Sequence, residues 1–234
     1  MRNGGRIYPI LAVAAVAALA GCRAEPETPQ FPKAHRDVAP IVDDAFSTED
    51  ARDRLGEAEE VMAFAGVTPG MSVADVGAGE GYYTVRLSKA VGAKGRVLAE
   101  DIQPQVRDAL SDRVQRESLD NVAVKLGTPD DPMLPHGSFD RIFLIHMYHE
   151  VQSPYAFLWH LREAVRPNGQ LIVVDANRPT IRHGTPPAQL KCEFAALGLK
   201  PVNFAVLTGG ESYAMAFEAT GPRPAPEQIK PCAD

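Results

Sequence analysis

The sequence has no excess of basic residues. Its 24 Lys and Arg side chains are outnumbered by 30 Asp and Glu side chains, so the formal net charge is -6. A protein that neutralises many phosphates, or a wide anionic lipid surface, needs a basic patch. We therefore expect no nucleic-acid partner.

Two common nucleotide-binding motifs are also absent. The sequence contains no G-x-x-x-x-G-K-[ST] loop, so it lacks the phosphate cradle of ATP-hydrolysing proteins. Gly77, Gly79 and Gly81 have the spacing G-x-G-x-G, and position 82, where a dinucleotide fingerprint needs glycine, is Tyr. This spacing disfavours a nicotinamide cofactor.

The chain has no apolar run that would span a bilayer comfortably. Residues 1–21 combine Arg2 and Arg6 with a short alanine-rich stretch that ends at Leu19-Ala-Gly-Cys22, whereas a hydrocarbon core is about 30 Å thick. This composition predicts an export signal. Its last four residues resemble the lipobox of bacterial lipoproteins, which implies cleavage before Cys22, a lipid on its sulfur and a membrane-anchored protein facing the periplasm. A non-cleaved amphiphilic anchor is the alternative.

Cysteine is scarce, with 3 in the chain. If Cys22 carries lipid, Cys192 and Cys232 remain, and an oxidising compartment would permit them to form a disulfide. Cys192 lies with Leu190 and Phe194 in a helical pattern, where a free, buried cysteine is the commoner outcome. The pattern favours an unpaired Cys192 and leaves the pairing open.

Proline divides the remainder of the chain into three parts. Residues 22–42 are rich in proline and poor in large apolar side chains, which predicts an extended tether. Residues 43–220 have the patterning of one folded domain, and residues 221–234 are again rich in proline and are expected to form a loose tail.

Short β-branched runs alternate with helical segments inside this domain. A capping-box-like Ser47 begins a predicted helix that continues to Ala65. The expected strands cover residues 73–76, 96–101, 121–126, 139–146, 170–175, 200–207 and 212–220. Five β-then-α units followed by a β-hairpin predict an α/β domain with a doubly wound, mostly parallel Rossmann-like sheet and an antiparallel strand near one edge.

Chemically capable residues follow the strands of this sheet. In an open α/β sheet, ligands bind beyond the carboxyl ends of the strands. Glycines at 77, 79 and 81 follow the first strand, and Asp101 ends the second strand 20 residues after Gly81. An acidic side chain at this spacing accepts hydrogen bonds from ribose hydroxyls, although an isolated Asp here would be only a solvated carboxylate.

These motifs, taken in order, resemble those of class I S-adenosylmethionine-dependent methyltransferases. The matching segments are 75–81, 100–104, 127–135, 138–140, 148–150 and 161–169. The resemblance implies a seven-stranded sheet with an antiparallel last strand and S-adenosylmethionine as cofactor. It assigns the following cofactor-binding residues: around the methionine end Asp75, Gly77, Gly79 and Gly81; at the ribose Asp101; against the adenine Ile102; and near the adenine edge Thr128 with Asp130 or Asp131.

Candidate catalytic residues come directly after the fourth strand. His146, Tyr148 and His149 lie where this family places groups that face the substrate. His149 is the preferred general base, because histidine titrates near neutral pH. The alternative is that one of the two histidines only forms a structural hydrogen bond at the rim.

A metal centre is the weaker interpretation, and we predict none. His146, His149 and Glu150 offer nitrogen and oxygen ligands, but no third His or Cys follows at metal-site spacing. His183 lies in a later loop that could approach them.

The predicted function is methyl transfer to a small molecule. The segment after the fourth strand, His-Met-Tyr-His, lacks the Asn/Asp-Pro-Pro-aromatic sequence of enzymes that methylate bases. Tyr82, Tyr83, Tyr148 and Phe157 could line an apolar pocket or belong to the core. Because the cofactor is made in the cytoplasm, the alternative is an exported lipoprotein that binds a small ligand without catalysis.

Overall fold

The computed structural model describes residues 1, 29–41 and 48–233, so the expected export signal, Cys22 and Ser47 lie outside the described residues. The strands are β1 (Ser72–Val76), β2 (Arg96–Asp101), β3 (Val122–Leu126), β4 (Phe139–Ile145), β5 (Val165–Ala176), β6 (Leu199–Val206) and β7 (Ser212–Ala219). The α-helices are α1 (Glu49–Leu55), α2 (Glu57–Phe64), α3 (Tyr82–Val91), α4 (Pro104–Arg116), α5 (Pro154–Ala164) and α6 (Pro187–Ala196). Short 3-10 turns are η1 (Tyr148–Glu150), η2 (Thr180–Arg182) and η3 (Pro226–Gln228).

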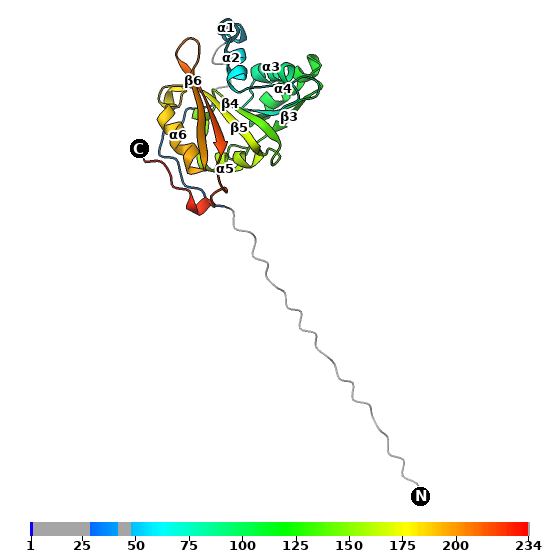
Figure 1. Ribbon diagram of the computed structural model, residues 1–234. Helices are drawn as coiled ribbons and strands as arrows, with labels where there is room; N and C mark the ends of the chain where they lie inside the picture. Colours follow the sequence, from blue (N-terminus) through cyan, green and yellow to red (C-terminus); the bar gives the residue numbers. More distant parts are fainter. Residues whose placement is uncertain (2–28, 42–47, 234) are drawn as a thin grey trace.

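The strands form one 7-stranded sheet in the order β3-β2-β1-β4-β5-β7-β6. β1 to β5 pair in parallel, while β7 runs antiparallel to both of its neighbours, β5 and β6. This confirms the expected doubly wound, mostly parallel sheet and its closing hairpin (Figure 1).

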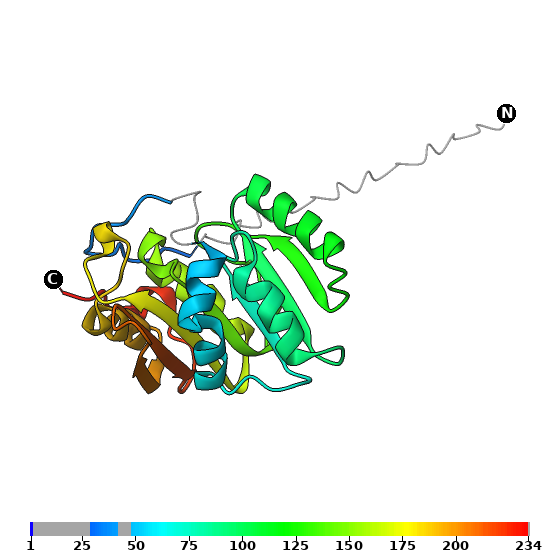
Figure 2. The same cartoon turned by 90° about the horizontal axis from the view of Figure 1, so that it is seen from above.

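Helices cover both faces of the sheet, with α2 and α3 on one side and α5 and α6 on the other (Figure 2). The central strands are therefore apolar on both faces, and alternate residues enter opposite cores. In β5, Leu171 and Val173 pack toward α5 and α6, whereas Ile172 and Val174 pack toward α2 and α3. All four are completely buried, and each contributes about 1.5–3 kcal/mol of transfer free energy.

The first predicted helix is in fact two helices. Gly56 adopts the left-handed conformation (φ 65°, ψ 26°) and caps α1 while it begins α2. Glycine tolerates this conformation without steric cost, so the chain turns between the helices. Leu55, the last residue of α1, is 51% exposed.

Other boundaries differ by a few residues. β5 begins at Val165 rather than Gln170, and its pairing with β4 shifts register between Phe139 and Arg141. β4 ends at Ile145, and His146 already leaves the strand with a left-handed φ of 52°. Inside β5, Asn168 has a left-handed φ of 66°.

The described parts of the expected tether and tail, residues 29–41 and 221–233, pack on the domain. In residues 29–41, the Arg36 guanidinium forms a buried ion pair with Glu193 (2.9 Å) and donates to the carbonyl of Val151 at 3.0 Å. In the C-terminal segment, Ile229 is 6% exposed within the α5–α6 core. The Arg36–Glu193 ion pair and the burial of Ile229 hold these proline-rich segments against the domain.

Cys192 and Cys232 form a disulfide, so the free, buried Cys192 favoured by the sequence pattern is wrong. The Cys192 side chain lies on the exposed side of α6. The packed C-terminal segment brings Cys232 to it, a contact that the local pattern around Cys192 does not encode.

Candidate active site

A cavity of about 940 Å³ lies beyond the carboxyl ends of β1, β2 and β4. Its volume is within the range of small-molecule sites. The walls include Gly77 and Gly79 after β1, Asp101 and Ile102 at β2, and His146 after β4. The structure therefore has a cavity where the sheet topology predicts a ligand-binding site.

The glycine turn presents backbone to this cavity. Gly77, Gly79 and Gly81 all have positive φ, at 67°, 54° and 88°. A Cβ at Gly79 would meet no atom within 4 Å, whereas one at Gly81 would lie 2.4 Å from Leu110 Cδ1 of α4. Gly79 thus lies open to a ligand, and Gly81 lets α4 approach the turn.

Asp101 ties β2 to this turn. It is 7% exposed, its Oδ2 accepts the Gly79 N–H at 3.1 Å, and its Oδ1 accepts the Gln103 N–H at 2.9 Å. Each carboxylate oxygen has a second lone pair for a ligand hydroxyl. The geometry suits the ribose-binding role that the sequence motif assigns.

Glu100 is a site residue that the sequence interpretation passed over in favour of its neighbour. It lines the cavity, is 1% exposed, and its Oε1 has no hydrogen-bond partner among the described residues. Burial, with the charge of Asp101, raises its pKa to about 8, despite a backbone hydrogen bond from Gly77. The signal in the sequence was the acidic pair at the end of one strand.

Asp75 is a structural residue beneath the glycine turn. It is 2% exposed, does not line the cavity, and accepts a hydrogen bond from Thr84 Oγ1 at 2.6 Å. Burial raises its pKa to about 6, partly opposed by that hydrogen bond. Among the other expected cofactor residues, Ile102 and Thr128 line the cavity, while Gly81 and the exposed Asp130 do not.

The two N-terminal helices supply an unexpected wall. Glu49, Arg52 and Leu55 of α1 and Glu57 of α2 line the cavity, and the Arg52 Nη2 donates to Glu57 Oε1 at 2.7 Å. The amphipathic pattern predicted helices here but carried no signal that they border a ligand site. The β6–β7 turn adds Thr208, whose N–H donates to Glu60 of α2 at 2.9 Å.

His146 points into this assembly. Its ring lines the cavity, and its Nε2 lies 3.2 Å from Glu57 Oε2. Burial alone would raise the pKa of Glu57, but His146 and Arg52 outweigh it and lower the value to about 2. Glu57 is therefore ionised and orients the imidazole.

Tyr148 and His149 are held behind the wall. Neither lines the cavity. The fully buried Tyr148 donates its hydroxyl to Glu193 at 2.6 Å, and His149 Nδ1 lies 3.0 Å from Asp175. Of the three expected catalytic residues, only His146 borders the cavity. Of the four expected aromatic residues, Tyr82 and Phe157 border it.

The lining of the cavity combines acidic and apolar side chains. A single arginine, Arg52, stands among the acidic lining residues Glu49, Glu57, Glu80, Glu100, Asp101, Glu150 and Glu211. The apolar part is made by Ile41, Leu55, Ile102, Ile145, Met147, Val151, Phe157 and Leu207. This surface attracts a cation and repels a phosphate.

The strand order, the antiparallel β7 and a glycine turn between β1 and α3 define the class I methyltransferase fold. Residues 74–173 match the family described as a methyltransferase domain. The chain thus has the class I methyltransferase fold, and part of it is similar to a methyltransferase domain family.

Named proteins of this class are similar to the chain. The demethylmenaquinone methyltransferase of Staphylococcus aureus is 27% identical over 123 residues, which cover 53% of this chain and 50% of that protein. The ubiquinone/menaquinone biosynthesis C-methyltransferase UbiE of Vibrio cholerae is 24% identical over 166 residues, covering 70% and 63%. The chain therefore spans about half to under two thirds of the length of these relatives.

A solved structure shares the architecture. The S-adenosylmethionine-dependent methyltransferase from Aquifex aeolicus superposes with a TM-score of 0.66 and 26% identity, covering 71% of this chain and 92% of that one.

No helix in the described ranges is both long enough and apolar enough to cross a membrane.

The residues present fit S-adenosylmethionine, the cofactor of this domain class. Gly79 offers open backbone, Asp101 has lone pairs for the ribose, and the Glu100 Oε1 is an unsatisfied acceptor in the wall. When bound, the cofactor supplies a methyl group already activated by its sulfonium.

Proposed function

We propose that this protein transfers the methyl group of S-adenosylmethionine to a small-molecule acceptor. The observation that carries the proposal is the bond between the glycine turn and Asp101 at the edge of an acidic cavity. The match of residues 74–173 to a methyltransferase domain supports it.

The charge of the cavity favours this cofactor over other adenosine ligands. S-adenosylmethionine carries a positive sulfonium and no phosphate. Among the lining residues, Arg52 is the one Arg or Lys, and its guanidinium is already bound to Glu57. A nucleotide phosphate would therefore face carboxylates without a free cation to balance it.

The protein's contribution to methyl transfer is alignment and, for an acidic acceptor, removal of a proton. We assign the proton acceptor to His146 rather than His149, because His146 lines the cavity. If its Nε2–H donates to Glu57, Nδ1 is left with the lone pair that accepts a proton.

We infer an acceptor with an apolar, cyclic body. The apolar wall formed by residues such as Met147, Val151 and Phe157 suits a flat ring. Relatives of this chain are named for ubiquinone and menaquinone synthesis, so quinol-type rings are the first acceptors to assay. The comparisons give no support to ligand binding without catalysis.

Calorimetry of the full-length chain in detergent with S-adenosylmethionine tests cofactor binding. Asp101→Asn should weaken affinity about tenfold or more, since a hydrogen bond to a charged acceptor is worth about 1.5–3 kcal/mol. Asp112→Asn, on the exposed side of α4, should leave it unchanged. If no heat of binding is measured at millimolar S-adenosylmethionine, the proposal is contradicted. Catalysis is tested separately by incubating the protein with methyl-tritiated S-adenosylmethionine and a set of quinols, and measuring transfer of the label.

We also propose that the chain is exported and anchored through lipid on Cys22, facing the periplasm. The Leu19-Ala-Gly-Cys22 sequence supports this, as does the Cys192–Cys232 disulfide, because disulfides persist in oxidising compartments. Cells fed a labelled fatty acid should label the wild type and not Cys22→Ser. Equal labelling of the wild type and Cys22→Ser would show that Cys22 does not carry the lipid.

A further inference from the structure

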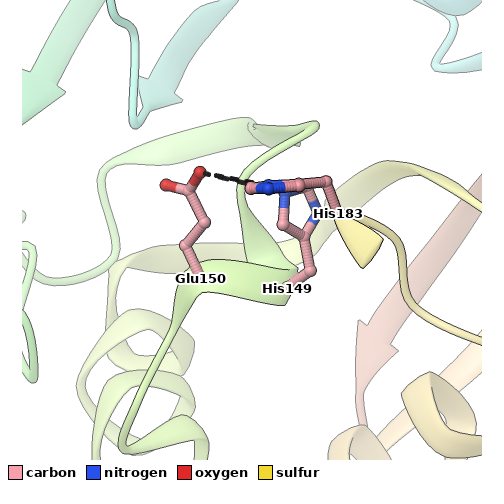
Figure 3. Close-up of side chains that lie close together, drawn as sticks. All are labelled: His149, Glu150 and His183. Atoms are coloured by element: carbon pink, nitrogen blue, oxygen red, sulfur yellow. Dashed lines mark ion pairs between the residues drawn. The ribbon is translucent and has the colours of Figure 1, made fainter. Parts of the chain in front are cut away.

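Three side chains converge beside the cavity: His149, Glu150 and His183 (Figure 3). One ligand atom from each lies within 4.8 Å of the other two. Glu150 Oε1 is 3.9 Å from His149 Nε2 and 4.0 Å from His183 Nδ1. Two imidazoles facing one carboxylate form a ligand set with a recognisable chemistry.

We propose that these residues bind a divalent transition-metal ion. Imidazole nitrogen suits Zn²⁺, Fe²⁺, Co²⁺ and related ions, and two histidines with one carboxylate form a common set that leaves coordination positions open. The oxygen-preferring Mg²⁺ and Ca²⁺ are disfavoured. The sequence analysis predicted no metal site. Of its weaker candidate set, His183 replaces His146, whose ring contacts Glu57.

The strongest support is the second layer of hydrogen bonds behind His149. Its Nδ1 faces the carboxylate of Asp175, at 3.0 Å and 3.1 Å from the two oxygens. Asp175 is completely buried and also accepts from Thr185 Oγ1 at 2.7 Å. A carboxylate that holds one ring nitrogen leaves the other, Nε2, as the metal ligand, which is how metal-binding histidines are oriented.

The backbone around the cluster is fixed from several sides. His183 has a left-handed conformation (φ 56°, ψ 60°), and its carbonyl accepts from Arg178 Nε at 3.2 Å. Ala39, in the N-terminal segment, donates its N–H to the His149 carbonyl at 3.2 Å. Arg36 donates to nearby carbonyls, while its charge is paired with Glu193.

Metal binding requires only a small closure of the cluster. Ligand atoms about 2.0–2.2 Å from one ion lie about 3.0–3.6 Å apart in octahedral or tetrahedral geometry. The 3.9 Å and 4.0 Å separations from Glu150 Oε1 therefore need to shorten by about 1 Å or less. The two imidazole ligand atoms, which lie within 4.8 Å of each other, need to shorten by up to about 2 Å, and side-chain rotation supplies movements of this size. Glu150 and Asp175 provide two negative charges to balance the ion.

The location suggests what the ion would do, and this part rests on the proposed function. Glu150 lines the cavity together with its neighbour Val151. An ion held there would bind an acceptor oxygen and lower the pKa of a hydroxyl group. This would assist the proton removal assigned to His146.

Titration of the full-length chain, stripped of metal by a chelator, with Co²⁺ tests the site. A visible absorption band should appear at one equivalent, and Zn²⁺ but not Mg²⁺ should displace it. His183→Ala and Glu150→Gln should each weaken Co²⁺ binding by about tenfold or more. His136→Ala is the matched control, because its ring also faces a carboxylate, Glu163 at 3.8 Å, but is 78% exposed.

The metal site would be overturned if excess Co²⁺ produced no visible absorption band in the wild type. Equal Co²⁺ affinity in the wild type and in both ligand variants would also overturn it. A variant that fails to fold is recognised by circular dichroism, and the other ligand variant then decides the outcome. The titration contains no S-adenosylmethionine, so a negative result leaves the proposed transferase intact, and failure of cofactor binding leaves the metal result standing.

Discussion

The amide of Gly79 donates a hydrogen bond to Asp101 Oδ2 at 3.1 Å and thereby joins the glycine turn after β1 to the end of β2. The two motifs, 22 residues apart in the sequence, form one structural unit at the edge of the cavity. The shape of the turn therefore controls the position of the carboxylate, and several measurable consequences depend on the residues around it.

Replacement of Gly81 by alanine should destabilise the fold by about 2–6 kcal/mol, because a positive φ and overpacking each cost about 1–3 kcal/mol. The new Cβ would lie 2.4 Å from Leu110 Cδ1. Gly70→Ala is the matched control, since Gly70 also has a positive φ, 91°, but no atom within 4 Å. Denaturant unfolding should show the smaller loss for Gly70→Ala, and equal losses would show that the contact with Leu110 is unimportant.

Glu100 should make the unliganded protein less stable as the pH rises. Its pKa is about 8 in the fold and about 4.3 in an unfolded chain. Between these values the native state binds the extra proton, so stability falls with increasing pH. At pH 7 the loss is roughly 4 kcal/mol at most.

Glu100→Gln should remove this slope and raise the melting temperature at pH 7 by several degrees. Melting curves between pH 6 and pH 8 provide the measurement, because the buried Asp75, with a pKa of about 6, adds its own slope at lower pH. Glu80→Gln, at an exposed carboxyl of the same cavity, should retain the wild-type slope. A Glu100→Gln curve parallel to the wild type would exclude the buried carboxyl as the cause.

His146→Gln should lower turnover about a hundredfold, which is typical for the loss of a general base. Cofactor affinity should change little, because His146 is assigned to the acceptor. His160→Gln is a suitable control, since its Nδ1 faces Asp131 at 3.6 Å and it does not line the cavity. Parallel losses of turnover and cofactor affinity would instead give His146 a role in cofactor binding.

Loss of the Cys192–Cys232 disulfide should destabilise the protein. The bridge closes a separation of 40 residues, for which chain entropy predicts about 4 kcal/mol. The double variant Cys192→Ser/Cys232→Ser and the wild type in reducing agent should melt at the same, lower temperature. Non-reducing peptide mapping would reveal the bridge directly, and free thiols at both positions in the oxidised protein would disprove it.

The sequence by itself determined the fold class and the location of the site. Strongly apolar strands separated by helical segments specify a parallel sheet covered on both faces, and such a sheet places its ligands at the strand ends. The glycine turn and Asp101 each lie at the end of a strand that the neighbouring sequence already specifies. Their positions were therefore predictable from sequence spacing alone.

Only the tertiary structure decided which side chains share a site. Tyr148 and His149 follow the same strand as His146, yet a left-handed residue at position 146 and a 3-10 turn send them behind the wall. His183 reaches Glu150 from a loop 33 residues later, and α1 and α2 return to border the cavity. These contacts join segments distant in the chain, so no local periodicity or spacing encodes them.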